Sequence, residues 1–383
     1  MRTSLVIDDF AFQRVEQSMW RYRSSLPIAP DSVPVTLGEG LTPLLRARSG
    51  PPGMRLFLKN ETINPTGSHK DRALSVSITK AIELGHSAVM LYSDGSTALS
   101  SAAYAARAGL RSFVVVAMGT PDYRVLPLYI YNSTVLEYQG SSAEALAWTS
   151  RACRAVGLYE TTTYRAADPY GAEGAKTISF EIVEQVDGVP AWVIVPVGGG
   201  GTISAIWRGF QELYEEGKIA SRPRLAAVLP NGYSLLERAF VAGASTDDDL
   251  RALMMPVLPP TIQVKTAMAY PPDGIEAIRA IRESNGLFFY ATDDQVLQGQ
   301  RRLGQEGVFA EPSAASVMTA ADRLSKLGIA AQDTVVAIIT GSGFRELGAM
   351  THSIQIERQL VDSISGIDNI RRLLSERKNI KAL

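Results

Sequence analysis

One lysine stands where the sequence passes from a turn to a helix. Lys70 follows the turn-forming run Asn64–His69, and the stretch Ala73–Leu84 has a helical pattern. The positive end of a helix disfavours an ammonium group, so a lysine there is more readily neutral. A neutral lysine amine is the nucleophile that forms a Schiff base with an aldehyde cofactor. An ordinary surface lysine after a turn would have the same local sequence, so the hypothesis depends on segments further along the chain.

A run of glycines supplies a second chemical feature. We predict a buried strand over Ala191–Val197 and a helix over Thr202–Tyr214, with Gly198–Gly201 between them. Glycines allow the backbone to approach an anion, and the first amides of the next helix are free to bind it. No lysine follows the glycines as in a P-loop, and they lack the spacing of a dinucleotide-binding turn. The run predicts a phosphate site, with a flexible turn as the alternative.

A hydroxyl at the end of a third predicted strand completes the set. The apolar run Thr334–Thr340 leads into Gly341-Ser342-Gly343. Ligands of open α/β sheets bind beyond the carboxyl ends of the strands, where the Thr340 hydroxyl can meet a heteroaromatic nitrogen. Lysine, phosphate site and hydroxyl together predict a pocket for pyridoxal 5′-phosphate (PLP).

Ordered motifs extend this prediction over roughly residues 20–350. The chain resembles the fold-type II PLP-dependent enzymes, and within them the threonine synthase-like branch. The motifs that carry the resemblance are Arg21–Pro27, Leu37–Leu44, Asn64–Arg72, Ala102–Gly109, Pro169–Gly174, Val195–Gly201 and Glu311–Ser316.

The resemblance implies an α/β fold of two three-layer α/β/α domains with mostly parallel sheets, similar to the tryptophan synthase β chain. It places a smaller, mobile domain at 85–165, a larger PLP-binding domain at 1–84 and 166–350, and a helical tail at 351–383. Alternation of strand and helix patterns independently favours βαβ units and parallel sheets. The predicted strands are Arg55–Lys59, Ala88–Tyr92, Ser112–Ala117, Thr134–Tyr138, Ala191–Val197, Arg224–Leu229, Leu287–Ala291 and Thr334–Thr340.

The same resemblance implies a role for each site residue. Lys70 forms the Schiff base and then moves protons at the substrate's α- and β-carbons, while Thr340 faces the pyridine nitrogen. The cofactor phosphate is held by Gly198, Gly199, Gly200, Gly201 and Thr202. Ser96 contacts the cofactor's phenolic oxygen, and the substrate is bound by Ser93, Asp94, Gly95, Thr97 and His69.

Three of these positions depart from the family. The substrate loop is usually Ser-Ser-Gly-Asn-Thr, whereas here Asp94 replaces a serine and Ser96 replaces the asparagine. Asp94 would repel a substrate carboxylate, which suggests an altered or cationic head group; alternatively it turns to solvent or caps the helix near Thr97. His69 replaces a phenylalanine and is either a proton relay or a packing residue. These changes argue against a housekeeping threonine synthase.

Composition limits the other classes of function. The chain has 383 residues with 46% hydrophobic and 20% charged residues, and its net charge of −1 gives no electrostatic case for nucleic acid. No apolar run approaches a membrane span. Cys153 is the only cysteine and is expected to be a buried apolar residue, and the three histidines lack metal-ligand spacing. We expect a cytoplasmic enzyme without a metal, and the family's habit suggests a homodimer.

The expected activity is a PLP-dependent elimination or replacement on a small amino acid with a leaving group at the β or γ carbon. A threonine synthase-like reaction is the first candidate. A serine/threonine dehydratase-type β-elimination, giving an oxo acid and ammonia, is the second. A non-catalytic homologue that binds PLP or a metabolite is the alternative from another class, motivated by the altered loop.

Overall fold

A computed structural model describes residues 17–255, 257–328 and 333–350 of the chain. The predicted helical tail, 351–383, lies outside these residues. The described residues up to Glu346 belong to one compact unit, and α13 (Leu347–Met350) belongs to a second. All that follows concerns the first unit.

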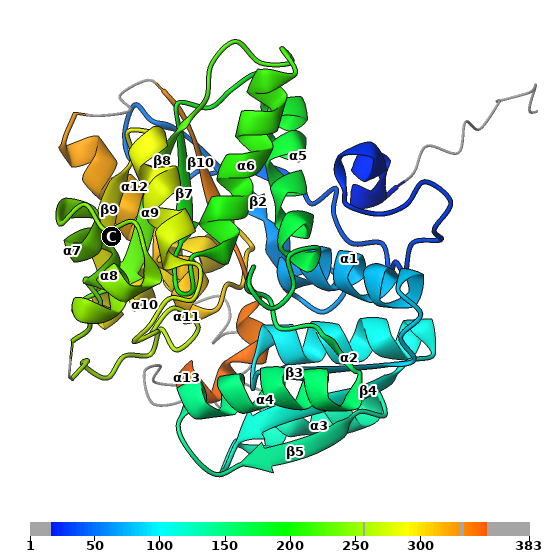
Figure 1. Cartoon of the computed structure of the whole chain (residues 1–383). Helices are drawn as coiled ribbons and strands as arrows, with labels where there is room; N and C mark the ends of the chain where they lie inside the picture. The colour runs from blue at the N-terminus through cyan, green and yellow to red at the C-terminus, as the bar shows by residue number, and fades with distance from the viewer. Residues whose placement is uncertain (1–16, 256, 329–332, 351–383) are drawn as a thin grey trace, which may run out of the picture. The chain divides into compact units, whose positions relative to one another are not determined.

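The described strands form two sheets (Figure 1). The larger sheet has the order β1-β2-β10-β7-β8-β9, with β1 antiparallel to β2 and the other neighbours parallel. The smaller sheet is parallel, with the order β5-β4-β3-β6. The strands are β1 (Leu44–Arg46), β2 (Arg55–Asn60), β3 (Ala88–Tyr92), β4 (Arg111–Ala117), β5 (Thr134–Tyr138), β6 (Tyr159–Glu160), β7 (Trp192–Pro196), β8 (Arg224–Pro230), β9 (Leu287–Ala291) and β10 (Thr334–Ile339).

The predicted strands are all present, with ends that differ by at most one residue. Two further strands, β1 and β6, were not predicted because three and two residues are too short for a periodic pattern. The mostly parallel order confirms the predicted α/β class.

Helices cover both faces of each sheet (Figure 1). The α-helices are α1 (Lys70–Glu83), α2 (Ser96–Ala108), α3 (Asp122–Ile130), α4 (Ser142–Val156), α5 (Thr177–Val186), α6 (Gly201–Glu215), α7 (Leu235–Val241), α8 (Asp247–Ala252), α9 (Gly274–Glu283), α10 (Asp293–Gln305), α11 (Pro312–Ala315) and α12 (Val317–Lys326). The 3₁₀ helices are η1 (Met19–Ser25), η2 (Glu61–Ile63), η3 (Gly171–Lys176) and η4 (Gly343–Arg345).

The alternation of side chains along the strands explains this covering. In β7, Val193 and Val195 pack with α5, α6, α7 and α9, whereas Trp192 and Ile194 pack with α10, α11 and α12. In β3, Leu91 packs with α2 and α3, whereas Met90 packs with Cys153 of α4. Cys153 is therefore a buried apolar residue, as predicted. Burial on both faces is why these parallel strands are nearly continuous apolar runs.

The strand order brings two predicted turns to one edge of the larger sheet. β7 and β10 are parallel neighbours, so the glycine run after β7 and the Thr340 turn after β10 leave the sheet at the same end. That end is where open α/β sheets bind their ligands.

Candidate active site

The glycine run leads directly into α6, which begins at Gly201. Gly200 precedes the helix with φ +92° and offers no side-chain cap, so the first amides of α6 lack an intrahelical acceptor. Within the described residues, the backbone N–H groups of Gly198–Ile203 donate no hydrogen bond to the protein. Unpaired amides at a helix N-terminus form a ready site for an anion such as a phosphate group.

Close packing explains why these residues are glycines. A Cβ on Gly198 would lie 2.9 Å from the Lys265 carbonyl oxygen, and one on Gly200 would lie 2.5 Å from that of Asp273. A Cβ on Gly201 would lie 2.6 Å from Asp273 Oδ2. The segment 265–273 therefore packs so closely against the glycine run that it leaves no room for a Cβ at these positions.

Backbone hydrogen bonds join the segment Gly67–His69, which precedes Lys70, to the residues that follow β10. Ser342 donates its backbone N–H to the Gly67 carbonyl at 2.8 Å, and His69 donates its own to the Thr340 carbonyl at 3.0 Å. Asp71 closes the preceding turn by accepting from the backbone N–H and hydroxyl of Thr66 at 2.7 and 2.6 Å. These contacts hold α1 so that it starts beside the turn after β10.

Lys70 is the first residue of α1, as the helix-terminus hypothesis requires. Its side chain is half-buried, and Nζ donates to Thr163 Oγ1 at 3.0 Å. Burial lowers the pKa of Lys70, while the charges of Asp273 and Glu311 oppose that shift. The lysine is thus biased toward the neutral amine that Schiff-base chemistry needs.

Thr163 connects the lysine to the predicted substrate loop. Its hydroxyl lies 3.0 Å from Lys70 Nζ and 3.3 Å from Thr97 Oγ1. Sequence analysis missed Thr163 because it follows the two-residue strand β6. A run of three threonines, 161–163, was the available signal.

The predicted site residues fall into two contact groups. His69 contacts Thr202 and Thr340, while Lys70 reaches Thr97 through Thr163. Both ring nitrogens of His69 thus meet predicted cofactor residues. In the part of the chain that the structure describes, no hydrogen bond joins Ser93, Asp94 or Ser96 to Lys70.

Asp94 neither caps α2 nor stands as a free charge. Gly95 is the N-cap of α2, and Asp94 Oδ2 accepts from Arg124 Nη1 at 2.8 Å. Arg124 also donates to Glu346 at 2.8 Å, and Lys265 Nζ lies 2.8 Å from the other oxygen of Glu346. Both alternatives from the sequence missed this network, because Arg124 and Glu346 are remote from the loop along the chain.

Lys265 brings positive charge to the same loop. A Cβ on Gly95 would lie 2.6 Å from Lys265 Nζ, so the ammonium packs against the loop backbone. The loop therefore presents Asp94 paired with Arg124 and, beside it, Lys265. This weakens the argument that the loop repels a substrate carboxylate.

Glu311 is a buried acid that the sequence hypothesis did not assign. A Cβ on Gly341 would lie 2.5 Å from its Oε1, so the carboxyl group packs against the turn after β10. Its Oε2 is buried and, among the described residues, has no hydrogen-bond partner. Burial is the largest cause that raises the pKa of Glu311 to about 7, and the charge of Glu346 adds to it. The charges of Lys265, Arg345 and Arg124 oppose this shift.

This shift predicts a pH-dependent cost of the Glu311 charge. The pKa of Glu311 rises from 4.5 to about 7 on folding. Its contribution to the stability of the folded protein is therefore complete below pH 4.5, and this contribution is lost as pH rises through 7. E311Q should therefore gain on the order of 3 kcal/mol of stability relative to wild type between pH 5 and 9. Urea unfolding of the cofactor-free proteins measures this difference. E216Q, at the exposed ion pair with Lys218, is the control, and parallel pH profiles for E311Q and wild type would contradict the assignment.

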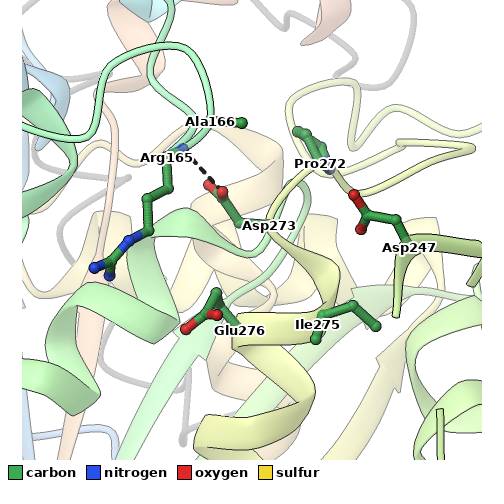
Figure 2. A pocket seen from close by; sticks show the side chains of 7 residues that line it. All are labelled: Arg165, Ala166, Asp247, Pro272, Asp273, Ile275 and Glu276. Atoms are coloured by element: carbon green, nitrogen blue, oxygen red, sulfur yellow. Dashed lines mark hydrogen bonds between the residues drawn. The ribbon is translucent and has the colours of Figure 1, made fainter. Parts of the chain in front are cut away.

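Asp273 packs against the glycine run and also lines a cavity of about 280 Å³, which is shown in Figure 2. Its Oδ1 accepts from the backbone N–H of Arg165 at 2.9 Å, and the guanidinium of Arg165 points away from it. Burial raises the pKa of Asp273, whereas the hydrogen bond from Arg165 and the charge of Lys70 oppose that shift. The cavity is lined by Arg165, Ala166, Asp247, Pro272, Asp273, Ile275 and Glu276.

The described residues contain no cluster of side chains suited to a metal ion. Nor does any helix among them have the length and apolar character needed to cross a bilayer.

The donors at this edge fit PLP. Unpaired amides suit its phosphate, and a half-buried lysine biased toward the neutral amine suits its aldehyde.

Comparisons with known proteins agree with this fit. The model of the family described as pyridoxal-phosphate dependent enzyme matches residues 35–341. The threonine synthase of Methanocaldococcus jannaschii is 32% identical over 377 residues, which cover 97% of this chain and 90% of that protein. The threonine synthase of Synechocystis sp. is 35% identical over 332 residues, which cover 85% of this chain and 82% of that protein.

Solved structures share the fold. Maize serine racemase superposes with a TM-score of 0.66 at 20% identity, covering 88% of this chain and 94% of that one. Threonine deaminase isoform 2 from Solanum lycopersicum gives a TM-score of 0.67 at 20% identity, covering 82% and 88%. At such identities the likeness concerns the fold alone, and it confirms the predicted fold class. Together with the family match and the close relatives, it shows that this chain belongs to the pyridoxal-phosphate-dependent enzymes.

Proposed function

We propose that this enzyme catalyses a threonine synthase-like elimination and replacement on a small amino acid with a leaving group at the β or γ carbon. The observation that carries the proposal is the path from Lys70 through Thr163 to Thr97, which joins the lysine to the substrate loop. Identity of 32% over 97% of the chain to a protein named threonine synthase supports the same assignment.

Each residue has a proposed role in this reaction. The amides of Gly198–Gly201 and the Thr202 hydroxyl hold the cofactor phosphate, and Ser96 donates to its phenolic oxygen. When bound, PLP supplies an electron sink for negative charge on the substrate. The Thr340 hydroxyl meets the pyridine nitrogen without keeping it protonated, a setting that favours elimination and replacement over transamination.

We assign proton movement at the substrate carbons to Lys70. Thr163 orients its amine through the 3.0 Å hydrogen bond, and burial lowers the pKa of Lys70, which favours the neutral amine that a base requires. The loop Ser93–Thr97 binds the substrate carboxylate through its amides and hydroxyls, with Lys265 against its backbone.

An assay with four substrates tests the proposal. O-phosphohomoserine and O-phosphoserine are compared with serine and threonine, and phosphate release and oxo-acid formation are measured. Phosphate release is the expected result. Oxo acid from serine or threonine alone would assign a dehydratase, and no reaction or spectral change with any substrate would indicate a non-catalytic PLP-binding protein.

The Asp94 ion pair gives a further prediction about the substrate loop. D94N should lower the KM for an anionic substrate roughly two- to fivefold with little change in kcat, because a half-exposed negative charge is removed beside the loop. The effect should shrink in high salt. D248N, which removes an acid from the exposed pair with Arg251, is the matched control. An unchanged or higher KM for D94N would argue that Asp94 instead serves a cationic head group.

Two of the remaining proposals follow from family resemblance. We propose that residues 85–165 form a smaller, mobile domain and that the enzyme is a homodimer. Composition, rather than the resemblance, is the basis for proposing that it works in the cytoplasm. Size-exclusion chromatography with light scattering tests the dimer.

A further inference from the structure

His69 joins the two turns that are proposed to hold opposite ends of the cofactor. Its Nδ1 lies 2.9 Å from the Thr340 carbonyl oxygen after β10, and its Nε2 lies 2.9 Å from Thr202 Oγ1 in the first turn of α6. The backbone N–H of His69 also donates to Thr340 O. Phenylalanine, the usual residue here in the family that the chain resembles, has neither nitrogen.

The hydrogen-bond partners of His69 determine where the protons of His69 and Thr202 lie. A carbonyl oxygen only accepts, so Nδ1 carries a proton. Burial, and then the charge of Lys70, lower the pKa of His69 to about 4, so the ring is neutral near pH 7 and Nε2 accepts. Thr202 therefore directs its single hydroxyl proton at Nε2.

Other charges near the ring act in both directions. The charge of Glu61 raises the pKa of His69, and that of Arg72 lowers it. From α6 and from the turn after β10, the ring nitrogens meet the uncharged Thr202 hydroxyl and Thr340 carbonyl.

A phosphate group at the start of α6 conflicts with this arrangement. A phosphate dianion accepts hydrogen bonds, and a hydroxyl has one proton to donate. While that proton is directed at Nε2, Thr202 Oγ1 presents only lone pairs to a phosphate oxygen. Protonation of Nε2 removes the conflict, because the ring then donates to Oγ1.

We propose that His69 takes up a proton when phosphate binds at the N-terminus of α6, so that Thr202 can donate to the phosphate. One proton passes from solvent to Nε2. The Thr202 proton stays on Oγ1 and turns from the ring to the phosphate. His69 is thus a positioning residue that acts through Thr202, and it places a positive charge near the cofactor phosphate. The inference rests on the proposed phosphate position at α6.

Histidine NMR can observe this proton. The chain has three histidines, so the ring signals of the labelled protein are few, and H69F identifies the one that matters. If H69F does not fold, H86Q and H352Q identify the signal by elimination. We expect PLP to raise the titration midpoint of His69 by at least about 3 pH units, from about 4 to about 7 or above. Pyridoxal also reacts with Lys70 but lacks the phosphate. With pyridoxal, most of the rise in the His69 midpoint should therefore be absent.

Two variants of Thr202 separate the relay from a general charge effect. T202S keeps the hydroxyl and should keep the rise in midpoint, whereas T202V should lose most of it. Linkage gives an independent readout: the PLP dissociation constant of H69F divided by that of wild type should increase as pH falls through the raised midpoint.

The outcomes distinguish this inference from the proposed function. An equal His69 midpoint with PLP and with pyridoxal, while both bind Lys70, would overturn the relay and leave the function intact. An undiminished rise in T202V would also overturn it. Failure of PLP to bind wild type at all would overturn the relay and the proposed function together.

Discussion

Replacement of Lys70 by alanine is expected to abolish the visible absorbance of the purified enzyme and to lower kcat by at least about 10³-fold. The reason is twofold: in the proposed function, Lys70 supplies both the amine that links the cofactor and the base at the substrate carbons. The loss should exceed that of T163V, which removes only the 3.0 Å hydrogen bond to Nζ. Absorbance spectra after reconstitution with PLP, together with steady-state rates, measure both effects.

K218A is the control for the loss of a lysine. Its ammonium lies on the surface and pairs with Glu216, so both absorbance and kcat should match wild type. A K70A protein that retained the absorbance band would remove the foundation of the proposed site. A wild type that stays colourless after reconstitution with PLP would do the same.

Replacement of Arg72 by methionine should cost about 3–5 kcal/mol in the free energy of unfolding. Arg72 is completely buried, with Nε 2.7 Å from Glu61 Oε2 and Nη1 2.5 Å from Glu181 Oε1. Lys59 also pairs with Glu181, at 2.6 Å. Methionine would fill much of the space but would leave two buried carboxylates with one cation between them. Urea unfolding of the cofactor-free protein at pH 7 measures the loss.

The acid range provides a check on the same network. Burial is the largest single influence on Glu61 and alone would raise its pKa, but the charge and hydrogen bonds of Arg72, together with the charge of Lys59, outweigh burial and lower the pKa to about 2. Its contribution to stability is therefore present above pH 4.5 and is lost as pH falls through 2. In R72M, Glu61 should instead titrate above its ordinary pKa, so stability should improve on acidification from pH 7.

R251M is the control for the Arg72 prediction. Its guanidinium pairs with the exposed Asp248, and removal of such a pair should change stability by less than about 0.5 kcal/mol. A loss in R72M as small as that in R251M would show that the buried network contributes little. Arg72 lies two residues after Lys70 in α1. Loss of the buried network should therefore also lower the affinity for PLP.

Local sequence predicted the parts of this site that depend on short-range rules. The turn at Gly67 and the helix that follows place Lys70 at a helix start, because backbone preference acts within a few residues. Apolar runs predicted β7 and β10, and the parallel pairing of the two strands brings the residues at their carboxyl ends to one edge of the sheet. Family resemblance then supplied the cofactor.

Contacts between distant residues escaped the same rules. The sequence around Asp94 does not predict its hydrogen bond with Arg124. Nor does the sequence around Arg124 predict its hydrogen bond with Glu346, which is 222 positions further along the chain. Glu311 and Asp273 likewise acquire raised pKa values mainly because folding buries them. A pattern of single residues carries no information about which charges will share a low-dielectric site.

The sequence by itself determined the alternation of strands and helices, the lysine at a helix start and the glycine run before α6, since each depends on neighbours along the chain. Only the tertiary structure decided that Asp94 is paired, that Thr163 meets Lys70 and that His69 spans Thr202 and Thr340. The physical reason is that hydrogen bonds and desolvation act over a few ångströms in space, whatever the separation in sequence.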